Sequence, residues 1–265
     1  MGVPPAQRVA RSFVSSLWLT GLFSSICLGL LMVAKTTAGE YYSLSGAGAS
    51  DTGIFAYQGL IALPMGTFDD TGPIIRVWAK TFAFKYRTDL IDPNVVLPPI
   101  KDVVINSQAY AVEVESGYQL AFGQGRLAGF VGASYRHYTM SPKDPGSDLA
   151  GDHYDLKLAL DGAIGAPTGG WGVGFNGSYV TGVEEYWAQL RPRYRWPSGM
   201  EIGLDLAGFG GRGYDYGRAG LFVGGFDLTE WGAEATYLSG EVGGQIDIGL
   251  DDPSAYGAVH VGVRF

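Results

Sequence analysis

Apolar and polar residues alternate along most of the chain beyond residue 40, with the period of two that indicates β-strands. The last eleven residues, AYGAVHVGVRF, show the pattern clearly. Val259, Val261 and Val263 fall on one face of an extended strand together with Phe265, because successive side chains point to opposite sides. A strand with so continuous an apolar face needs an apolar environment along its length.

Three other segments, at 110–122, 152–164 and 200–208, set a charged face against an apolar one. The charged faces do not suit the core of a soluble domain, and the apolar faces do not suit water. An outer-membrane β-barrel satisfies both faces, since its outer wall meets lipid and its lumen is polar. We therefore predict an all-β protein, a single antiparallel outer-membrane β-barrel. The alternative is a soluble β-sandwich in which 255–265 is a buried edge strand.

The alternating segments predict about twelve strands, and ten is the alternative count. An even number would bring both termini to the periplasmic side of a single-chain barrel. The predicted strands are 41–48, 53–63, 74–87, 106–122, 126–139, 152–165, 170–182, 184–197, 200–209, 214–227, 231–240 and 255–265.

The lengths of the connections give an independent check on this count. Short turns are expected on the periplasmic side and longer loops on the outer side. The three longest predicted connections, 88–105, 140–151 and 241–254, all fall on the outer side. The 64–73 connection is longer than a usual periplasmic turn.

The first 39 residues have the composition of a secretory signal peptide. Arg8 and Arg11 precede a long apolar stretch, and small residues follow it, so we expect cleavage after Ala38 or Gly39. The alternative is an uncleaved transmembrane anchor. The predicted domains are therefore a signal peptide at 1–39 and a barrel at 40–265, exported to the outer membrane of a Gram-negative cell.

Charge and cysteine content narrow the possible functions. Removal of the signal segment changes the formal net charge from −8 to −11, which argues against a nucleic-acid partner. Cys27, the only cysteine, lies within the signal segment, so the mature chain would have no disulfide and no cysteine metal site. No cofactor motif and no metal-ligand spacing is recognisable.

The strongest charge signal is YWAQLRPRYRW at 186–196, in which Arg191, Arg193 and Arg195 share one face. Arginines that point into a lumen need carboxylate partners. The structural interpretation is a salt-bridge network that fills a narrow barrel, and the functional one is an arginine ladder that guides an anion or a polymer. The candidate partners are Glu201, Asp205, Asp155, Asp161, Glu113, Glu115 and Glu234.

Histidines and aromatic residues near the outer strand ends offer two weaker hypotheses. His137 and His153 flank the 140–151 connection near Asp152 and Asp155, so a histidine–aspartate pair at the rim could act as a general base. No serine stands at nucleophile spacing, and we predict a protein that is not an enzyme. The tyrosines in this region suit the aromatic girdle of a barrel, with sugar stacking as the alternative for those that face the lumen.

The C-terminal residue suggests how the protein is assembled. A terminal aromatic residue after alternating apolar ones is typical of the signal by which barrel-assembly machinery recognises its clients. Phe265, Val263 and Val261 are the candidate signal residues, and the predicted partners are this machinery and outer-membrane lipid.

Several stretches together resemble the proteobacterial BcsS family of cellulose biosynthesis proteins. The most specific are Ser141, Pro142, Asp144 and Pro145, then Tyr186 and Trp187 with Arg191, and GYDYGRAG at 213–220. The resemblance implies an outer-membrane component that accompanies cellulose synthesis and export, with cellulose or the cellulose synthase complex as partners. It carries over no catalytic residue.

Three functions remain open at this point. The leading hypothesis is a non-enzymatic barrel that helps to export, anchor or organise cellulose. The others are a pore for small solutes or ions and a barrel-rim hydrolase.

Overall fold

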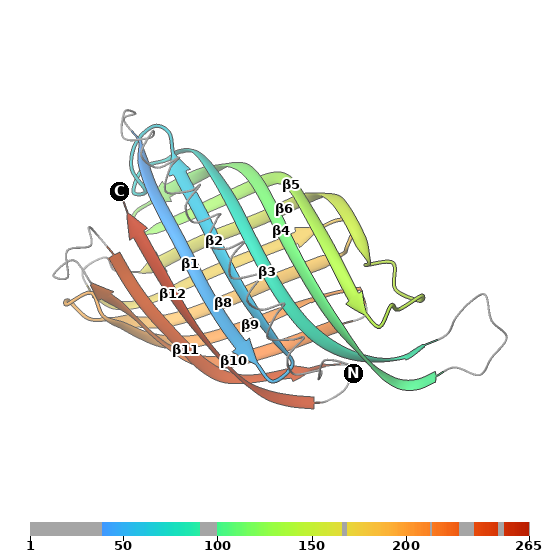
Figure 1. The fold of residues 1–265 in the computed structure, drawn as a ribbon. Coiled ribbons are helices and arrows are strands. Elements are labelled where there is room, and N and C mark those ends of the chain that lie inside the picture. The colour runs from blue at the N-terminus through green and yellow to red at the C-terminus, as the bar shows by residue number, and fades with distance from the viewer. Residues whose placement is uncertain are drawn as a thin grey trace.

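The computed structural model describes residues 39–90, 100–165, 169–212, 214–227, 236–248 and 252–264. Twelve antiparallel strands form one closed barrel (Figure 1). Each strand pairs with its neighbours along the chain, and β1 pairs with β12. The predicted fold class and strand count are therefore confirmed.

The strands follow one another in an up-and-down order without crossovers. Their bounds are β1 (Glu40–Ser50), β2 (Gly53–Leu63), β3 (Gly72–Leu90), β4 (Ile100–Phe122), β5 (Gly125–Ser141), β6 (Gly151–Gly165), β7 (Gly170–Val180), β8 (Glu185–Arg195), β9 (Glu201–Gly211), β10 (Tyr214–Asp227), β11 (Thr236–Asp247) and β12 (Asp252–Arg264).

The predicted boundaries were wrong at the eleventh strand. β11 covers 236–247, so most of the predicted outer connection 241–254 is strand. The glycines and charges of this segment resemble a loop in sequence. However, Glu241 and Gln245 point inward and Val242 and Ile246 outward, which is a strand pattern.

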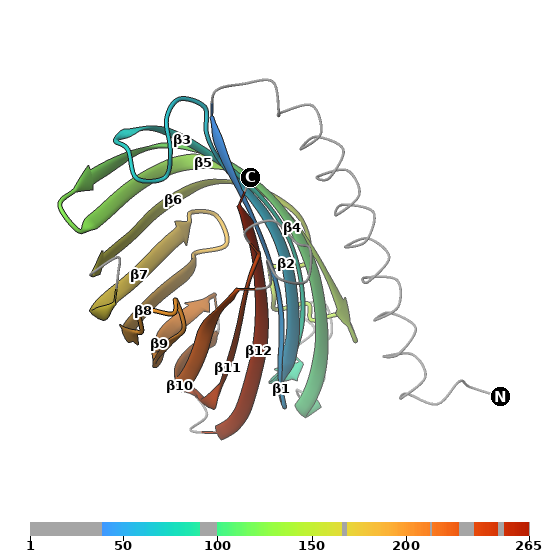
Figure 2. The same ribbon diagram turned by 90° about the vertical axis from the view of Figure 1, so that its left-hand side faces the viewer.

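The barrel closes between its first and last strands. Nine residue pairs join β1 to β12, from Tyr42 opposite Arg264 to Ser50 opposite Tyr256, so no strand edge is left open. Glu40 and Arg264 form an ion pair beside this seam. β1 begins and β12 ends at the same end of the barrel, here called the terminal end, and the opposite end is the loop end (Figures 1 and 2).

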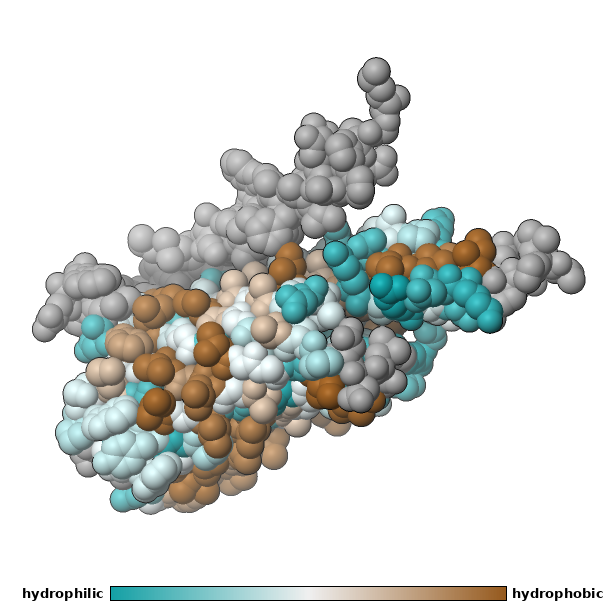
Figure 3. All heavy atoms as spheres, turned by 90° about the horizontal axis from the view of Figure 1, so that it is seen from below, coloured by the Kyte–Doolittle hydropathy of each residue, from teal (hydrophilic) through white to brown (hydrophobic). Residues whose placement is uncertain are grey.

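The outer wall carries an apolar band. Along β6, Leu156, Leu158, Leu160 and Ile164 are each 46–49% exposed, and Tyr154 is 79% exposed. Ten residues of a tilted strand span about 25 Å of height, which matches the apolar band of outer-membrane barrels. Figure 3 shows hydrophobic residues gathered over the side of the barrel.

Exposed aromatic residues border this band at both ends. Tyr110 and Tyr154, with the half-buried Tyr135 between them, lie toward the loop end, and Trp171 and Trp196 lie toward the terminal end. This placement is that of the girdles found at the two membrane interfaces.

Three strands are longer than the others. β3, β4 and β5 contain 19, 23 and 17 residues, whereas β7, β8 and β9 contain 11 each. The extra residues project beyond the rest of the barrel at the loop end (Figure 1). The predicted 88–105 connection shrinks accordingly, because strand pairing continues to Leu90 opposite Ile100.

Glycines allow large rings to lie flat against the wall. A Cβ at Gly46 would stand 2.6 Å from both the Tyr57 ring and the Nδ1 of His260. The absence of a side chain at Gly46 therefore lets Tyr57 and His260 meet across β1, between β2 and β12.

Three of the sequence predictions concern residues outside the described ranges. They are the signal peptide, which includes Cys27, the candidate acid Glu234 and the terminal Phe265. Within the described ranges, none of the helices is both long and apolar enough to span a membrane.

Candidate functional site: the barrel lumen

A buried cluster of charges occupies the lumen beside β3 to β6, and we call it the Glu113 cluster. Glu113 accepts hydrogen bonds or ion pairs from Lys80 at 2.8 Å, Arg136 at 3.0 Å and Lys157 at 2.5 Å. Glu115 lies 3.1 Å from Lys157. The side chains of Glu113 and Glu115 are wholly buried, so their charges depend on these partners rather than on water.

Two arginines extend this cluster across strands that are not adjacent. Arg76 on β3 lies 2.8 Å from Glu115 and also pairs with Asp161 on β6. Arg136 on β5 pairs with Glu185 on β8. The cluster contains four basic and four acidic groups, so its formal charge is balanced.

A second charge cluster lies beside β8 to β12, and we call it the Asp205 cluster. Asp205 is buried and accepts hydrogen bonds from Arg191 at 2.8 Å, Arg218 at 2.9 Å and Tyr256 at 3.2 Å. Glu241 pairs with the same two arginines. Arg191 and Arg218 therefore tie β8 and β10 to β9 and β11 within the lumen.

A third group of charges lies closer to the terminal end. Arg193 Nε is 3.3 Å from Glu201 Oε2, and Arg195 Nη2 is 3.0 Å from the same oxygen. The side chains of Arg193 and Arg195 are 23% and 37% exposed. One carboxylate thus serves two guanidinium groups that retain contact with solvent.

Aromatic rings meet across the lumen at the loop end. The rings of Phe84 on β3 and Tyr214 on β10 have centroids 5.7 Å apart. These strands are five places apart around a barrel of twelve, so the contact joins nearly opposite walls. We call this pair the aromatic bridge. Tyr86 packs beside Phe84, and Tyr216 packs beside Tyr214.

Connections at the loop end close the space beside the aromatic bridge. Leu149, from the connection after β5, and Val183, from the turn after β7, are buried against Ile105, Tyr138 and Met140. Tyr86 donates a hydrogen bond to Asp144 at 2.9 Å. The loop end is therefore packed with apolar side chains.

The terminal end is filled on one side by the 64–71 connection. Phe68 is buried with Leu63, Ile74 and Phe130, and its backbone carbonyl accepts a 2.9 Å hydrogen bond from Gln119. The unusual length predicted for this connection is explained by this fold back into the lumen.

Comparison with known families decides the identity of the chain. Residues 25–265 match the family described as "Cellulose biosynthesis protein BcsS". The chain belongs to the BcsS family. The resemblance seen in the sequence is thereby confirmed.

Solved structures similar to this BcsS-family chain are β-barrels of very different sequence. An outer membrane channel from Pseudomonas putida F1, "COG4313", is 12% identical over 86% of this chain and 96% of its own, with a TM-score of 0.49. The translocator domain of autotransporter NalP from Neisseria meningitidis is 12% identical over 99% and 100%, with a TM-score of 0.47. The KdgM porin is 9% identical over 84% and 99%, with a TM-score of 0.44. A search of curated proteins returned no match.

The predicted carboxylate partners divide between the three groups of charges. Glu201 and Asp205 lie against the arginines of β8, as expected. Glu113, Glu115 and Asp161 do not, and that part of the expectation was wrong. Their strands lie on the other side of β7, and cations of β3, β5 and β6 reach them first.

Asp155 also takes no part in the ion pairs found among the described residues of this BcsS-family barrel. Its Oδ2 is buried without a hydrogen-bond partner among the described residues, and its carboxylate lies against Gly182 in the turn after β7. The level of Asp155 along β6, near the loop end, keeps it from the arginines of β8.

Sequence reasoning missed most of the cations of the lumen. They share the inward register of the acids they neutralise, and this register was the signal available in the sequence. The missed residues are Arg76, Lys80, Arg136, Lys157 and Arg218, together with the acids Glu185 and Glu241.

The histidines of the BcsS-family barrel are placed on different faces. His137 projects outward, and its Nδ1 lies 2.7 Å from Asp152, beside the half-buried Tyr135. His153 points inward, and its Nε2 lies 2.9 Å from the carbonyl oxygen of Leu149. The two histidines therefore do not form one site at the rim.

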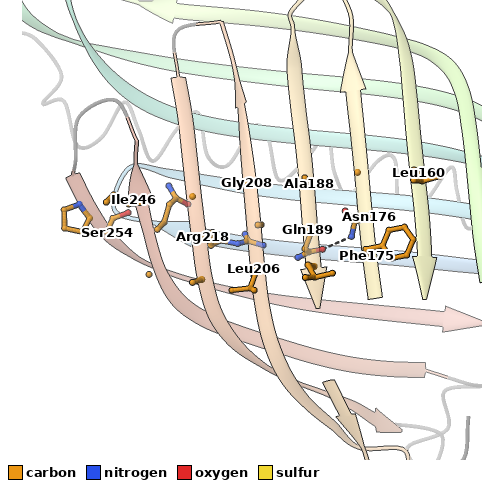
Figure 4. Close-up of a pocket in the computed structure, with 18 residues that line it drawn as sticks. Leu160, Phe175, Asn176, Ala188, Gln189, Leu206, Gly208, Arg218, Ile246 and Ser254 are labelled. Carbon is orange, nitrogen blue, oxygen red and sulfur yellow. Dashed lines mark hydrogen bonds between the residues drawn. The ribbon is translucent and has the colours of Figure 1, made fainter. Parts of the chain in front are cut away.

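An apolar groove of about 860 Å³ runs over β6 to β12 (Figure 4). Outward-facing Phe175, Leu190 and Leu206 border a floor that includes Ala188 and Gly208. Small residues on adjacent strands at one level make this hollow. Its apolar lining matches the lipid-facing band rather than the lumen.

Proposed function

We propose that the barrel is a non-enzymatic outer-membrane accessory of cellulose biosynthesis, which anchors or organises the polymer at the cell surface without conducting it. Membership of the BcsS family supports the link to cellulose. The predicted signal peptide and the apolar band of the wall support export to the outer membrane, through the barrel-assembly machinery.

The aromatic bridge is the observation that favours anchoring over export. A polymer that crossed the lumen would have to separate Phe84 from Tyr214 and displace the packed connections beside them. It would then meet the Glu113 cluster, whose buried side chains line the lumen along β4 and β5. Breaking buried ion pairs of this kind costs about 3–5 kcal/mol each.

The loop end offers surfaces suited to a polysaccharide. Phe82, Phe84 and Tyr86 form a row of neighbouring rings on the inward face of β3 at the loop end, and all three are partly exposed. Aromatic faces pack against the apolar faces of sugar rings, with no charge required of the sugar. Cellulose is uncharged, so this row suits it better than the charged groups deeper in the lumen do.

Cellulose attachment in a producing strain tests the proposal. We expect deletion of the gene to leave total cellulose nearly unchanged and to shift polymer from the cells to the medium. Restoration of attachment by the wild-type gene would support the proposal. Loss of all extracellular cellulose, with polymer retained in the periplasm, would contradict it and favour export.

A covalent cross-link across the aromatic bridge distinguishes anchoring from export more sharply. The predicted mature chain contains no cysteine, so Phe84→Cys with Tyr214→Cys can be joined specifically by a bifunctional thiol reagent. We expect the joined barrel to retain as much cellulose attachment as the Phe84→Cys single variant, which lacks the same ring. A variant with Phe84→Cys alone, treated with the same reagent, controls for modification. Export arrested only in the joined barrel would overturn the proposal.

A further inference from the structure

Charged side chains of the lumen differ in their contact with solvent. The acids Glu113, Glu115, Asp205 and Glu241 are 0–1% exposed, and the cations Arg76, Arg136, Lys157 and Arg218 are 1–4% exposed. Arg193 and Arg195, toward the terminal end, are 23% and 37% exposed, whereas their partner Glu201 is 15% exposed. The most exposed charges of this third group are therefore positive, although the whole chain is acidic.

The positive charge is least compensated at the terminal end. Arg193 and Arg195 share the single carboxylate of Glu201. Arg126, near the start of β5, is an exposed residue at the same end of the barrel, and none of the ion pairs between described residues includes it. Two guanidinium groups of β8 thus share one carboxylate, and a third lies at the same end of the barrel.

Two further acids of the described residues at this end, Glu40 and Asp69, face another arginine. Glu40 is engaged by Arg264, which also lies 3.8 Å from Asp69. Tyr42, which contributes a hydroxyl group to the same region, is uncharged at neutral pH. The net formal charge of Arg126, Arg193, Arg195 and Glu201 is +2.

We infer that Arg126, Arg193 and Arg195 form a binding site for a small multivalent anion bearing phosphate or carboxylate groups. Guanidinium groups bind both with paired, charge-assisted hydrogen bonds. Their positions on β5 and β8 would let one anion contact both walls. The walls also limit hydration, which strengthens such contacts relative to open water.

The anion enters from the terminal end. The aromatic bridge and the packed connections close the loop end, and Phe68 fills the terminal end on the side of β2 to β5. Arg193 and Arg195 lie on the side that Phe68 leaves open. With the termini on the periplasmic side, the ligand is a periplasmic solute. Because cellulose is neutral, this site goes beyond the proposed function.

Titration calorimetry on the purified, folded barrel in a non-ionic detergent tests the site, with pyrophosphate and succinate as separate probes. We expect at least one probe to bind, and Arg193→Gln or Arg195→Gln to weaken its binding about tenfold, as loss of a charge-assisted contact does. Arg87→Gln is the matched control, because Arg87 pairs with Asp102 at the exposed loop end.

A variant that removes a negative charge, instead of a positive one, distinguishes anion binding from a structural role. Glu201→Gln removes the carboxylate that competes with the anion, so it should tighten anion binding. If the arginines had only a structural role, the same change would lower the stability of the barrel and would not raise its affinity for anions. Binding confined to pyrophosphate would assign a phosphate ligand, and binding of succinate a dicarboxylate. Failure of both probes to bind at about 10 mM, or equal binding by Arg193→Gln and the wild type, would overturn the inference. Neither result bears on cellulose attachment, which is measured separately.

Discussion

The ring of Phe84 on β3 lies 5.7 Å from the ring of Tyr214 on β10, with their planes inclined at 36°. The contact links strands that share no hydrogen bond and lie on nearly opposite walls. Ring pairs of this kind contribute about 0.5–1.5 kcal/mol beyond the area they bury. The bridge therefore adds to the packing that closes the loop end, and it is weak enough to be removed without unfolding the barrel.

Removal of the bridge should open the loop end to ions. We expect the double variant Phe84→Ala, Tyr214→Ala to raise single-channel conductance in planar bilayers several-fold over a low wild-type value. The free energy of unfolding should fall by about 3–5 kcal/mol at most for each ring, as for truncation of a buried aromatic side chain. Tyr154→Ala is the control, because Tyr154 faces outward. A wild-type barrel that already conducts as well as the variant would show that the bridge does not close the lumen.

Glu113 should be the most sensitive charge in the barrel. Glu113→Gln leaves Lys80, Arg136 and Lys157 without their shared anion in a space that water scarcely reaches. We expect the free energy of unfolding, measured by urea titration in detergent, to fall by about 3–5 kcal/mol.

The comparison is with an exposed ion pair. Asp102→Asn breaks the pair with Arg87, in which both side chains are more than half exposed, and should cost about 0–1 kcal/mol. Equal effects of the two variants would mean that water reaches the Glu113 cluster freely.

Deletion of Phe265 should affect assembly more than stability. The outward valines of β12, Val261 and Val263, already pair with β1 opposite Ser45 and Ser43, so the seam does not depend on one further residue. We expect lower outer-membrane yield and an envelope stress response in cells, with an unchanged unfolding midpoint for the refolded protein. Val259→Ala, an outward change on the same strand, is the control. Normal yield of the deletion variant would refute the assembly signal.

Asp70 should stabilise the 64–71 connection only at pH values above the pKa of its carboxyl group. Its carboxylate accepts hydrogen bonds from the backbone N–H of Thr67 at 2.8 Å and from the Thr67 hydroxyl at 2.9 Å. These bonds, the backbone one first, hold the pKa of Asp70 below its usual value. The contribution of Asp70 is therefore present at neutral pH and is lost as the pH falls through the lowered pKa.

Carbon-13 NMR titration of the Asp70 carboxyl group measures this effect. The midpoint should lie below that of an unperturbed aspartate. Thr67→Ala keeps the backbone donor and removes the hydroxyl, so it should move the midpoint only part of the way back. An ordinary midpoint in the wild type would show that the turn is not formed in solution.

Alternation along the chain was sufficient to predict the barrel, because the inward and outward faces of each strand meet opposite environments. The same register placed Arg191, Arg193 and Arg195 on one face with Glu201 and Asp205 on the next strand. Pairs between adjacent strands follow directly from register, and these were predictable.

Contacts across the lumen were not predictable in this way. Arg76 with Asp161 and Phe84 with Tyr214 depend on the tilt and curvature of the wall and on the lengths of the side chains. The glycine-rich 241–247 segment was taken for a loop because glycine weakens a strand signal. In the barrel it is held on both sides, by β10 and β12.

The extra length of β3 and β4 fixes where a fibre would first touch the cell. Beyond the exposed Tyr110, β4 continues outward for residues 100–108, which is about 20 Å of height for a tilted strand. The outward side chains there include Asn106 and Gln108, which suit water rather than lipid. On the proposed function, this stiff, hydrogen-bonded extension would stand above the bilayer, and a cellulose strand approaching the surface would reach it before it reached any lipid headgroup.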